Sequence, residues 1–293
     1  MQKIEYGNYA AEIDELGAQL THLKNISDGF DYIWNNELWP KHAPILFPAI
    51  GRSNDDSYLI EGRKYSMPQH GFAADQEFDV VANDGQSVKL RLNSSNETKT
   101  MYPYDFVLDV TFSISDEGLK VQFNVENKTN GDMSYSLGYH PAFNIPIDDE
   151  GTFKDYHLDF NPMPSQLDKF EIVKKPNPYR SGNVLPVKDF DNNGIDLNYE
   201  MFDAGLVILT DKSLSSVEVS SKMSKHSIKV HFEDFDYLTL WTKEGAKAPF
   251  LCIEPFNGLP DVYGGLAELS TKEANHHLAD GQEDNFSIDI ELN

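Results

Sequence analysis

Two segments of the chain place a titratable side chain directly before proline at the end of a strand-like apolar run. His140 precedes Pro141, and Glu254 precedes Pro255. Because proline restricts its neighbour to extended backbone and offers no N–H to a strand ladder, we expect both side chains to lie at strand ends where pairing stops. A carboxylate and an imidazole held in this way suit general base and general acid chemistry near neutral pH. The same spacing also fits two ordinary exposed residues at strand ends.

Three further residues carry side chains that could bind a polar ligand. Arg52 follows the apolar run 44–50, His70 lies at a strand-like edge, and Asp203 precedes another apolar run. A guanidinium donates paired hydrogen bonds, and a neutral imidazole can donate or accept one. Taken singly, each residue also fits a structural role: a surface ion pair for Arg52, a satisfied histidine for His70 and a turn or cap for Asp203.

The order of these motifs resembles the aldose 1-epimerase family, the galactose mutarotases, and most closely its LacX-like branch. The motifs run through the chain as Gly51-Arg52, His70-Gly71-Phe72, Tyr139-His140-Pro141-Ala142-Phe143, Asp203 and Glu254-Pro255. One departure is Ala74, where relatives often carry arginine. That departure bears on how the substrate, or a phosphate on it, would be recognised.

The resemblance implies a sandwich of antiparallel strands with an open cleft for a free sugar. By the same resemblance, Glu254 is the general base and His140 the general acid, while Arg52 and His70 orient the substrate. Asp203 is then an acceptor for the ring hydroxyls. Interconverting two anomers needs one base and one acid, so we expect no cofactor and no metal.

Alternating apolar and polar residues predict an all-β chain. Leu119, Val121, Phe123 and Val125 alternate with polar residues, as on a half-buried strand. Glycine-containing turns at 116–118 and 83–85 predict hairpins that join this strand to 106–115, and 78–82 to 88–92. Many short strands without alternating helices favour a large antiparallel β-sandwich, with residues 1–293 as one domain.

Other predicted elements are less regular. We expect further strands at 3–13, 32–35, 134–139, 217–221, 227–232, 238–241, 251–253 and 286–292. Helical turns are expected at 97–104 and at 271–278, the second capped by Thr271 and presenting His276 and His277 as a surface pair. The Pro- and Asn-rich segment 161–193 is expected to be a long loop bordering a binding site.

Composition narrows the class of protein. The 293 residues carry a formal net charge of −24, which disfavours nucleic acid and anionic membrane surfaces as partners. The single cysteine, Cys252, excludes an intrachain disulfide and is expected to be a buried small residue. No signal-peptide pattern or apolar run of membrane-spanning length is present, so we expect a cytoplasmic protein, either a monomer or a homodimer.

These observations favour an aldose 1-epimerase that interconverts the α and β anomers of a free aldose such as galactose or glucose. Two alternatives stay open. A hexose-6-phosphate mutarotase would need additional cations around the cleft. A non-catalytic sugar-binding sandwich would bind sugar without accelerating anomer exchange, because a fold does not fix a function.

Overall fold

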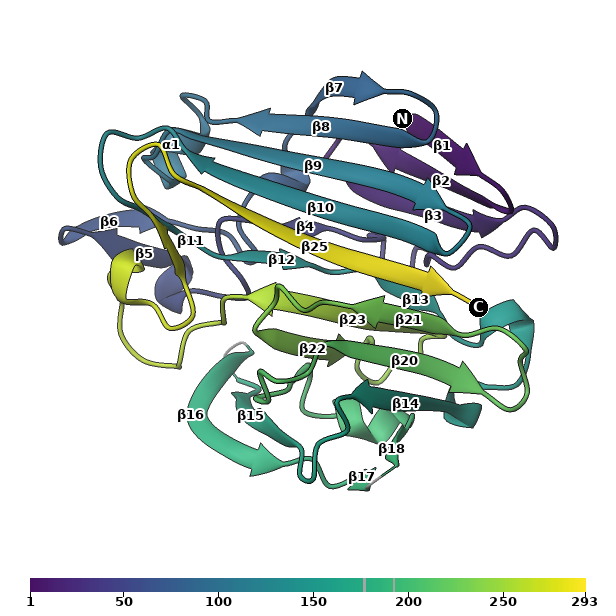
Figure 1. Ribbon diagram of the computed structural model, residues 1–293. Coiled ribbons are helices and arrows are strands. Elements are labelled where there is room, and N and C mark those ends of the chain that lie inside the picture. The colour runs from purple at the N-terminus through teal and green to yellow at the C-terminus, as the bar shows by residue number, and fades with distance from the viewer. Residues whose placement is uncertain (176–177, 192) are drawn as a thin grey trace.

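A ten-stranded antiparallel sheet runs through the computed structural model, which describes residues 1–175, 178–191 and 193–293 (Figure 1). In spatial order its strands are β17 (Phe190–Asp191), β18 (Gly194–Asp196), β14 (Tyr156–Asn161), β20 (Ser216–Ser221), β21 (Ile228–His231), β25 (Glu283–Leu292), β10 (Gly118–Asn127), β9 (Phe106–Ser115), β8 (Ser87–Asn93) and β7 (Asp79–Asn83). The C-terminal strand β25 therefore lies in the middle of the sheet, beside β10.

A second sheet of six strands packs against the first. Its strands are β19 (Val207–Ile208), β22 (Tyr237–Trp241), β23 (Phe250–Asn257), β12 (Leu137–Tyr139), β4 (Ile45–Leu46) and β13 (Ala142–Asn144). The remaining strands form one three-stranded sheet, β1 (Gln2–Tyr6), β2 (Tyr9–Asp14) and β3 (Gln19–Asn25), and the pairs β5 (Ser57–Ile60) with β6 (Arg63–Ser66), β11 (Met133–Tyr135) with β24 (His276–Leu278), and β15 (Asp168–Val173) with β16 (Tyr179–Pro186).

The described helices are single turns. They are α1 (Thr98–Met101) and the 3-10 turns η1 (Asn54–Asp56), η2 (Ala73–Asp75), η3 (Ile147–Asp149), η4 (Phe153–Asp155), η5 (Tyr199–Phe202) and η6 (Leu269–Thr271). Within the described ranges, none of these helices has the length and apolar character needed to cross a membrane.

The main hydrophobic core lies between the two large sheets. The predicted alternation holds in β10, where Leu119, Val121, Phe123 and Val125 are buried and the residues between them are more exposed. The Phe123 ring contacts Tyr139 of β12 with centroids 5.9 Å apart, which joins the two sheets directly. Burial of such aromatic side chains supplies much of the energy that holds a sandwich together.

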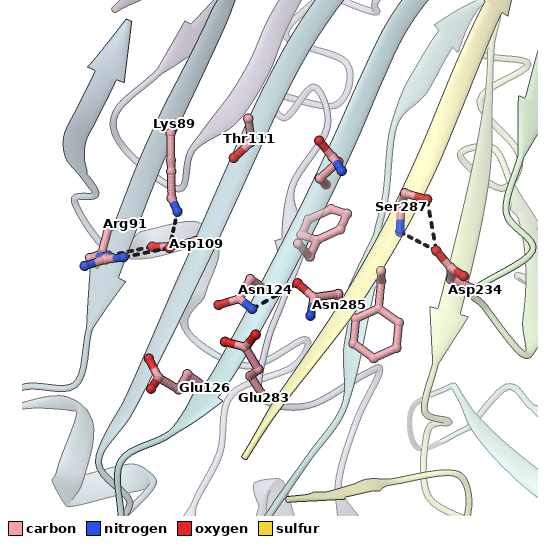
Figure 2. A pocket seen from close by; sticks show the side chains of 13 residues that line it. Lys89, Arg91, Asp109, Thr111, Asn124, Glu126, Asp234, Glu283, Asn285 and Ser287 are labelled. Atoms are coloured by element: carbon pink, nitrogen blue, oxygen red, sulfur yellow. Dashed lines mark hydrogen bonds and ion pairs between the residues drawn. The ribbon is translucent and has the colours of Figure 1, made fainter. Parts of the chain in front are cut away.

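The outer face of the ten-stranded sheet is polar. A hollow of about 490 Å³ lies on this face, over β8, β9, β10 and β25. Figure 2 shows the side chains that line it. Lys89 and Arg91 converge there on Asp109, whose carboxylate lies 2.6 Å from each of them. Burial alone would raise the pKa of Asp109, but the hydrogen bonds from Arg91 and Lys89 hold it below its ordinary value. Asp109 is therefore the ionised partner, at neutral pH, in an ion-pair cluster.

The six-stranded sheet has two different faces. Leu251 and Ile253 of β23 point into the main core, whereas Cys252 and Glu254 point the other way, because successive side chains of a strand alternate. All eight residues of β23 are buried. Side chains on its outer face must therefore be covered by the loops and hairpins that pack there.

The predicted hairpins and most predicted strands are confirmed, with three differences. The expected strand 3–13 is a hairpin, β1–β2, because Gly7 turns the chain with a φ of 56°. Residues 134–139 form two strands, β11 and β12, that pair with different partners. Residues 32–35 contribute only an isolated bridge, between Ile33 and Phe143, and so form no regular strand.

Two other predictions named the wrong type of secondary structure. The expected helix 271–278 is instead the turn η6 followed by strand β24, since His276–Leu278 pairs with β11 and tertiary pairing overrides local preference. His276 and His277 thus alternate across a strand, and His277 Nδ1 lies 2.8 Å from Ser134 Oγ. The expected loop 161–193 contains the β15–β16 hairpin and β17, apart from residues 176, 177 and 192, which lie outside the description.

Gly71 makes a close approach that positions its neighbour His70. Gly71 has a φ of 76°, and a Cβ atom there would lie 2.2 Å from the Phe47 carbonyl oxygen. His70 itself has a φ of 68°, which is rare for a residue with a side chain. The short segment is thus held in a left-handed conformation against β4.

We expect Gly71→Ala to lower the free energy of unfolding by at least about 2 kcal/mol, since it adds steric overlap to the cost of a left-handed backbone. Gly62→Ala is the matched control, because Gly62 has the same φ of 76° and no atom within 4 Å of its added Cβ. Urea denaturation of both variants measures the difference. Equal destabilisation would contradict the close-approach account.

Candidate functional site

A pocket of about 370 Å³ opens on the outer face of the six-stranded sheet. Its lining comes from β4, β22, β23, η2 and the loops between them, and comprises Trp39, Lys41, Pro44, Leu46, Gln69, His70, Gly71, Ala74, Asp75, His140, Pro178, Leu206, Trp241, Glu244 and Glu254. Three of the five residues singled out in the sequence, His70, His140 and Glu254, therefore meet in one pocket.

Glu254 lies in the middle of β23 and not at a strand end as expected. On one side β23 pairs without interruption with β22, where Thr239 stands opposite Glu254. On the other side β23 pairs first with β13 and then with β12, and the ladder is broken between them. The Ile253 N–H donates to Pro141 on that side, and Pro255, two residues on, has no N–H to offer there.

His140 occupies the break in this ladder. The pairings of β12 and β13 with β23 share one register, which places His140 directly opposite Glu254. The His140 backbone N–H donates to the Pro44 carbonyl oxygen, 3.0 Å away, so the chain is anchored to the β4 side. Opposed residues on neighbouring strands project on the same face of a sheet. The two side chains therefore meet on the pocket side.

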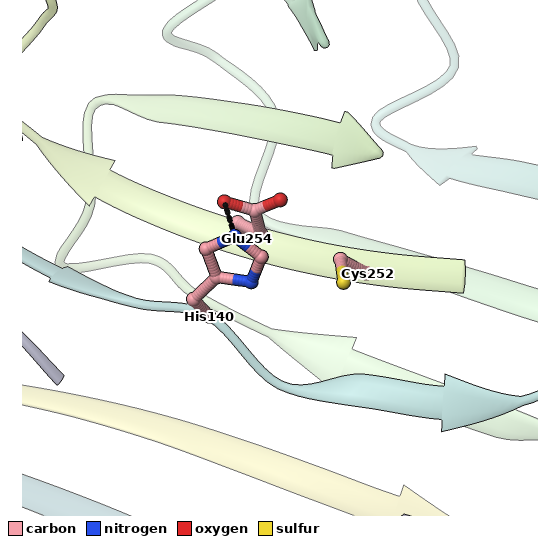
Figure 3. Close-up of side chains that lie close together, drawn as sticks. All are labelled: His140, Cys252 and Glu254. Atoms are coloured by element: carbon pink, nitrogen blue, oxygen red, sulfur yellow. Dashed lines mark ion pairs between the residues drawn. The ribbon is translucent and has the colours of Figure 1, made fainter. Parts of the chain in front are cut away.

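The imidazole and the carboxylate form a buried pair. His140 Nε2 lies 3.2 Å from Glu254 Oε2, and the two side chains are 9% and 2% exposed (Figure 3). Burial raises the pKa of Glu254 well above its ordinary value and lowers the pKa of His140 well below its own. Strongly shifted groups in a cleft are typical of acid–base sites.

His70 presents a neutral imidazole to the same pocket. Its ring lies edge-on to His140 with centroids 5.7 Å apart. The Gly51 N–H donates to His70 Nδ1 over 3.2 Å, and His70 Nε2 lies 3.2 Å from the side-chain amide nitrogen of Gln69. Burial, together with the charges of Lys41 and Arg52, lowers the pKa of His70 to about 4. His70 is therefore a neutral imidazole at neutral pH.

Arg52 lies outside the pocket lining. Its guanidinium Nη1 is 3.0 Å from Asp56 Oδ1, and its buried Nε has no hydrogen-bond partner among the described residues. Because its charge contributes to the lowered pKa of His70, Arg52 acts on the pocket through that neighbour.

The structure does not bring Asp203 to the pocket. Asp203 is exposed at the end of η5, where its backbone oxygen accepts a hydrogen bond from Lys174. The chain then turns into β19, and it is Leu206, three residues later, that lines the pocket. The carboxylates at the pocket besides Glu254 belong to Asp75 and Glu244.

Two tryptophans complete the site, and Trp39 was missed in the sequence. The Trp39 ring stacks on His140 with centroids 5.2 Å apart, and it contacts Trp241 at 5.5 Å. An aromatic residue before Pro40, next to Lys41, was the only local signal for Trp39. Aromatic faces offer apolar contact area beside polar groups, which suits a ligand with both kinds of surface.

Comparison with known proteins places the chain in a family. A family model described as aldose 1-epimerase matches residues 2–265. The chain belongs to the aldose 1-epimerase family. A curated relative, the chromosomal protein LacX of Lactococcus lactis subsp. lactis, is 31% identical over 257 residues, which is 83% of each chain.

Solved structures of this family share the fold. A galactose mutarotase-like protein from Lactobacillus casei ATCC 334 is 38% identical and superposes with a TM-score of 0.95 over 100% of both chains. A galactose mutarotase related enzyme from Lactobacillus acidophilus is 25% identical, with a TM-score of 0.91 over 100% of this chain and 97% of that one. The large antiparallel β-sandwich predicted from the sequence is thus confirmed as galactose mutarotase-like.

The buried carboxyl predicts a pH-dependent cost in stability. Because the pKa of Glu254 is raised in the folded state, its contribution to stability is present below about pH 4.5 and is lost as the pH rises. Glu254→Gln should therefore gain stability over the wild type as the pH increases, by up to about 1.4 kcal/mol per pH unit.

Thermal unfolding of both proteins from about pH 5.5 to pH 8.5 measures this effect. The exposed Glu244→Gln removes one negative charge from the same pocket and serves as the control. A constant difference between the wild type and Glu254→Gln across the range would contradict a raised pKa at Glu254.

Proposed function

We propose that the protein is a mutarotase that interconverts the α and β anomers of a free aldose such as galactose or glucose. The observation that carries this proposal is the buried His140–Glu254 pair, 3.2 Å apart in a pocket of about 370 Å³, in a chain of the aldose 1-epimerase family. A pocket of that size suits one small ligand.

In the proposed reaction, Glu254 accepts the proton of the anomeric hydroxyl while His140 donates a proton to the ring oxygen. The hydroxyl oxygen forms the carbonyl bond with C1, and the electrons of the C1–ring oxygen bond pass to the ring oxygen. Rotation about C1–C2 turns the carbonyl over. The reverse transfers then close the ring on the other face and restore both groups, so no further reactant is consumed.

The buried pair can reach the protonation state that the reaction needs without taking up a proton from solvent. An ionised Glu254 with a doubly protonated His140 holds as many protons as a neutral acid with a neutral imidazole. Burial opposes the charged form of each group, which brings these two arrangements closer in free energy than they are in water. His70 hydrogen-bonds a sugar hydroxyl, and the charge of Arg52 helps to keep His70 neutral. Asp203 is left out of this proposed machinery because of its place on the surface.

The charges at the pocket favour a neutral sugar. Among the described lining residues, Lys41 is the one fixed cation, and the carboxylates of Asp75 and Glu244 line the same pocket. The chain as a whole carries a net charge of −24. A phosphate dianion would meet this field without the group of arginines and lysines that usually binds one.

The setting of the proposed reaction is the cytoplasm, with the protein as a monomer or a homodimer. The buried, unpaired Cys252 accords with a reducing compartment.

We expect freshly dissolved α-galactose or α-glucose to reach its equilibrium rotation faster with the protein than without it. Polarimetry at micromolar protein measures the rate for several aldoses. Binding of sugar by calorimetry with no acceleration for any aldose would support a non-catalytic sugar-binding protein instead.

Glu254→Gln and His140→Asn should each lower kcat by about 10²- to 10⁴-fold, because each variant keeps a hydrogen-bonding group but loses proton transfer. Sugar binding should change much less. Cys252→Ala is the matched control, since Cys252 lies on the same face of β23 two residues from Glu254. A Glu254→Gln protein that keeps more than about a tenth of wild-type kcat would remove Glu254 from the base role.

Neutral aldoses should have a higher kcat/KM than their 6-phosphates, for the electrostatic reason given above. Coupled assays with paired substrates, glucose against glucose 6-phosphate, measure the ratio at matched ionic strength. A clear preference for the phosphorylated sugar would overturn this assignment and point to the hexose-6-phosphate alternative.

A further inference from the structure

Cys252 lies beside the acid–base pair. Its Sγ atom, one nitrogen of His140 and one carboxylate oxygen of Glu254 all lie within 4.8 Å of one another. Figure 3 shows the three side chains meeting between β23 and the segment that follows β12. All three residues are buried, so this arrangement is built into the packing of the sheet.

The spacing of these donor atoms suits one metal ion. Sulfur, imidazole nitrogen and carboxylate oxygen bind Zn²⁺ at about 2.0–2.3 Å, which separates nitrogen and oxygen ligands of a tetrahedral ion by about 3.3 Å. The pair His140 Nε2 and Glu254 Oε2 is already 3.2 Å apart. Little movement is therefore needed for both to bind one ion.

The other ring nitrogen of His140 takes no part in binding the ion. Among the described residues none pairs with His140 Nδ1, which is buried in a side chain that is 9% exposed. In Figure 3 this nitrogen is on the side of the ring that faces Cys252. Because one imidazole gives one nitrogen to one ion, the ion takes Nε2, the nitrogen beside Glu254.

We propose that His140, Cys252 and Glu254 form a site for a thiophilic divalent cation such as Zn²⁺, and that occupancy of this site inhibits the enzyme. The inhibitory part rests on the proposed mutarotase function, whereas the binding part does not. The site differs from a metalloenzyme centre because here the metal takes the very atoms that would transfer protons.

The chemistry of binding accounts for the inhibition. The thiol proton and the one proton held by the Glu254–His140 pair pass to solvent, and the sulfur binds as thiolate, which a coordinated ion stabilises. One oxygen of Glu254 and one nitrogen of His140 donate their lone pairs to the ion and are no longer free to accept or deliver a proton. Because His140 and Glu254 also line the pocket, water or a sugar hydroxyl there can supply a fourth ligand.

The ligand set also defines which ions it excludes. Sulfur and imidazole favour Zn²⁺ or Co²⁺, whereas Mg²⁺ prefers an octahedron of oxygens. A second cluster of potential ligands, Asp28, Asp148 and His226, lies elsewhere and is partly exposed. That cluster has no sulfur, so the two sites are distinguishable by spectroscopy.

Co²⁺ titration of the protein, stripped of metal beforehand, tests the site directly. Cys252 is the only cysteine of the chain, so a sulfur-to-cobalt charge-transfer band in the near ultraviolet can arise only from it. We expect the band to saturate near one equivalent, to be lost in Cys252→Ala and Cys252→Ser, and to persist in His226→Ala and in excess Mg²⁺. A wild-type protein that gives no such band would overturn the proposal.

Polarimetry supplies the second readout. Zn²⁺ should slow the wild-type enzyme and EDTA should restore it, while Cys252→Ala should keep its basal activity and need roughly tenfold more Zn²⁺ or higher for the same inhibition. A cobalt band without inhibition would overturn the inhibitory part alone. If no mutarotase activity exists at all, the cobalt band still decides whether the metal site is real.

Discussion

The site depends on one constraint: a carboxyl and an imidazole are buried together, away from water. In solution the imidazole is the stronger base, so a proton shared between the two groups stays on nitrogen. Burial penalises each charged form, which raises the pKa of Glu254 and lowers that of His140. The difference between the proton affinities of the two groups is thereby reduced. Moving a proton from one group to the other through a bound sugar therefore costs less free energy.

The fold buries the two side chains and still leaves a pocket open beside them. The main core between the two sheets uses one face of β23, through Leu251 and Ile253, and leaves the other face for Cys252 and Glu254. The ladder break at Pro255 then admits His140 opposite Glu254. A rigid, fully buried strand is a better support for such a pair than a loop, because side-chain positions there are fixed by packing on both sides.

Several features of this arrangement could be predicted from the sequence. The alternation in β9 and β10, the glycine turns and the prolines after His140 and Glu254 are local signals, and they placed both groups on extended backbone. The register between β12, β13 and β23 is not local, since it is set by partners more than 100 residues apart. For that reason the sequence could place Glu254 beside a pairing break but not in the middle of a strand.

Other parts of the site depend on contacts that no local pattern reveals. The Trp39 ring stacks on His140, and Lys41, two residues later, also lines the pocket. Asp203 carried the right chemistry in the right order, yet the turn after η5 directs Leu206 to the pocket. The misassigned helix 271–278 has the same origin, because strand β24 forms only where β11 is present to pair with it.

The proposed function requires the His140–Glu254 pair to transfer protons to and from a bound aldose. Two-dimensional ¹³C exchange spectroscopy of C1-labelled glucose and galactose at equilibrium measures this transfer, because it observes α and β signals interconvert without any net reaction. We expect exchange cross-peaks with the wild-type protein and none above the spontaneous level with Glu254→Gln, although saturation transfer still shows that the sugar binds. Equal cross-peaks for the two proteins would exclude Glu254 from the proton transfer.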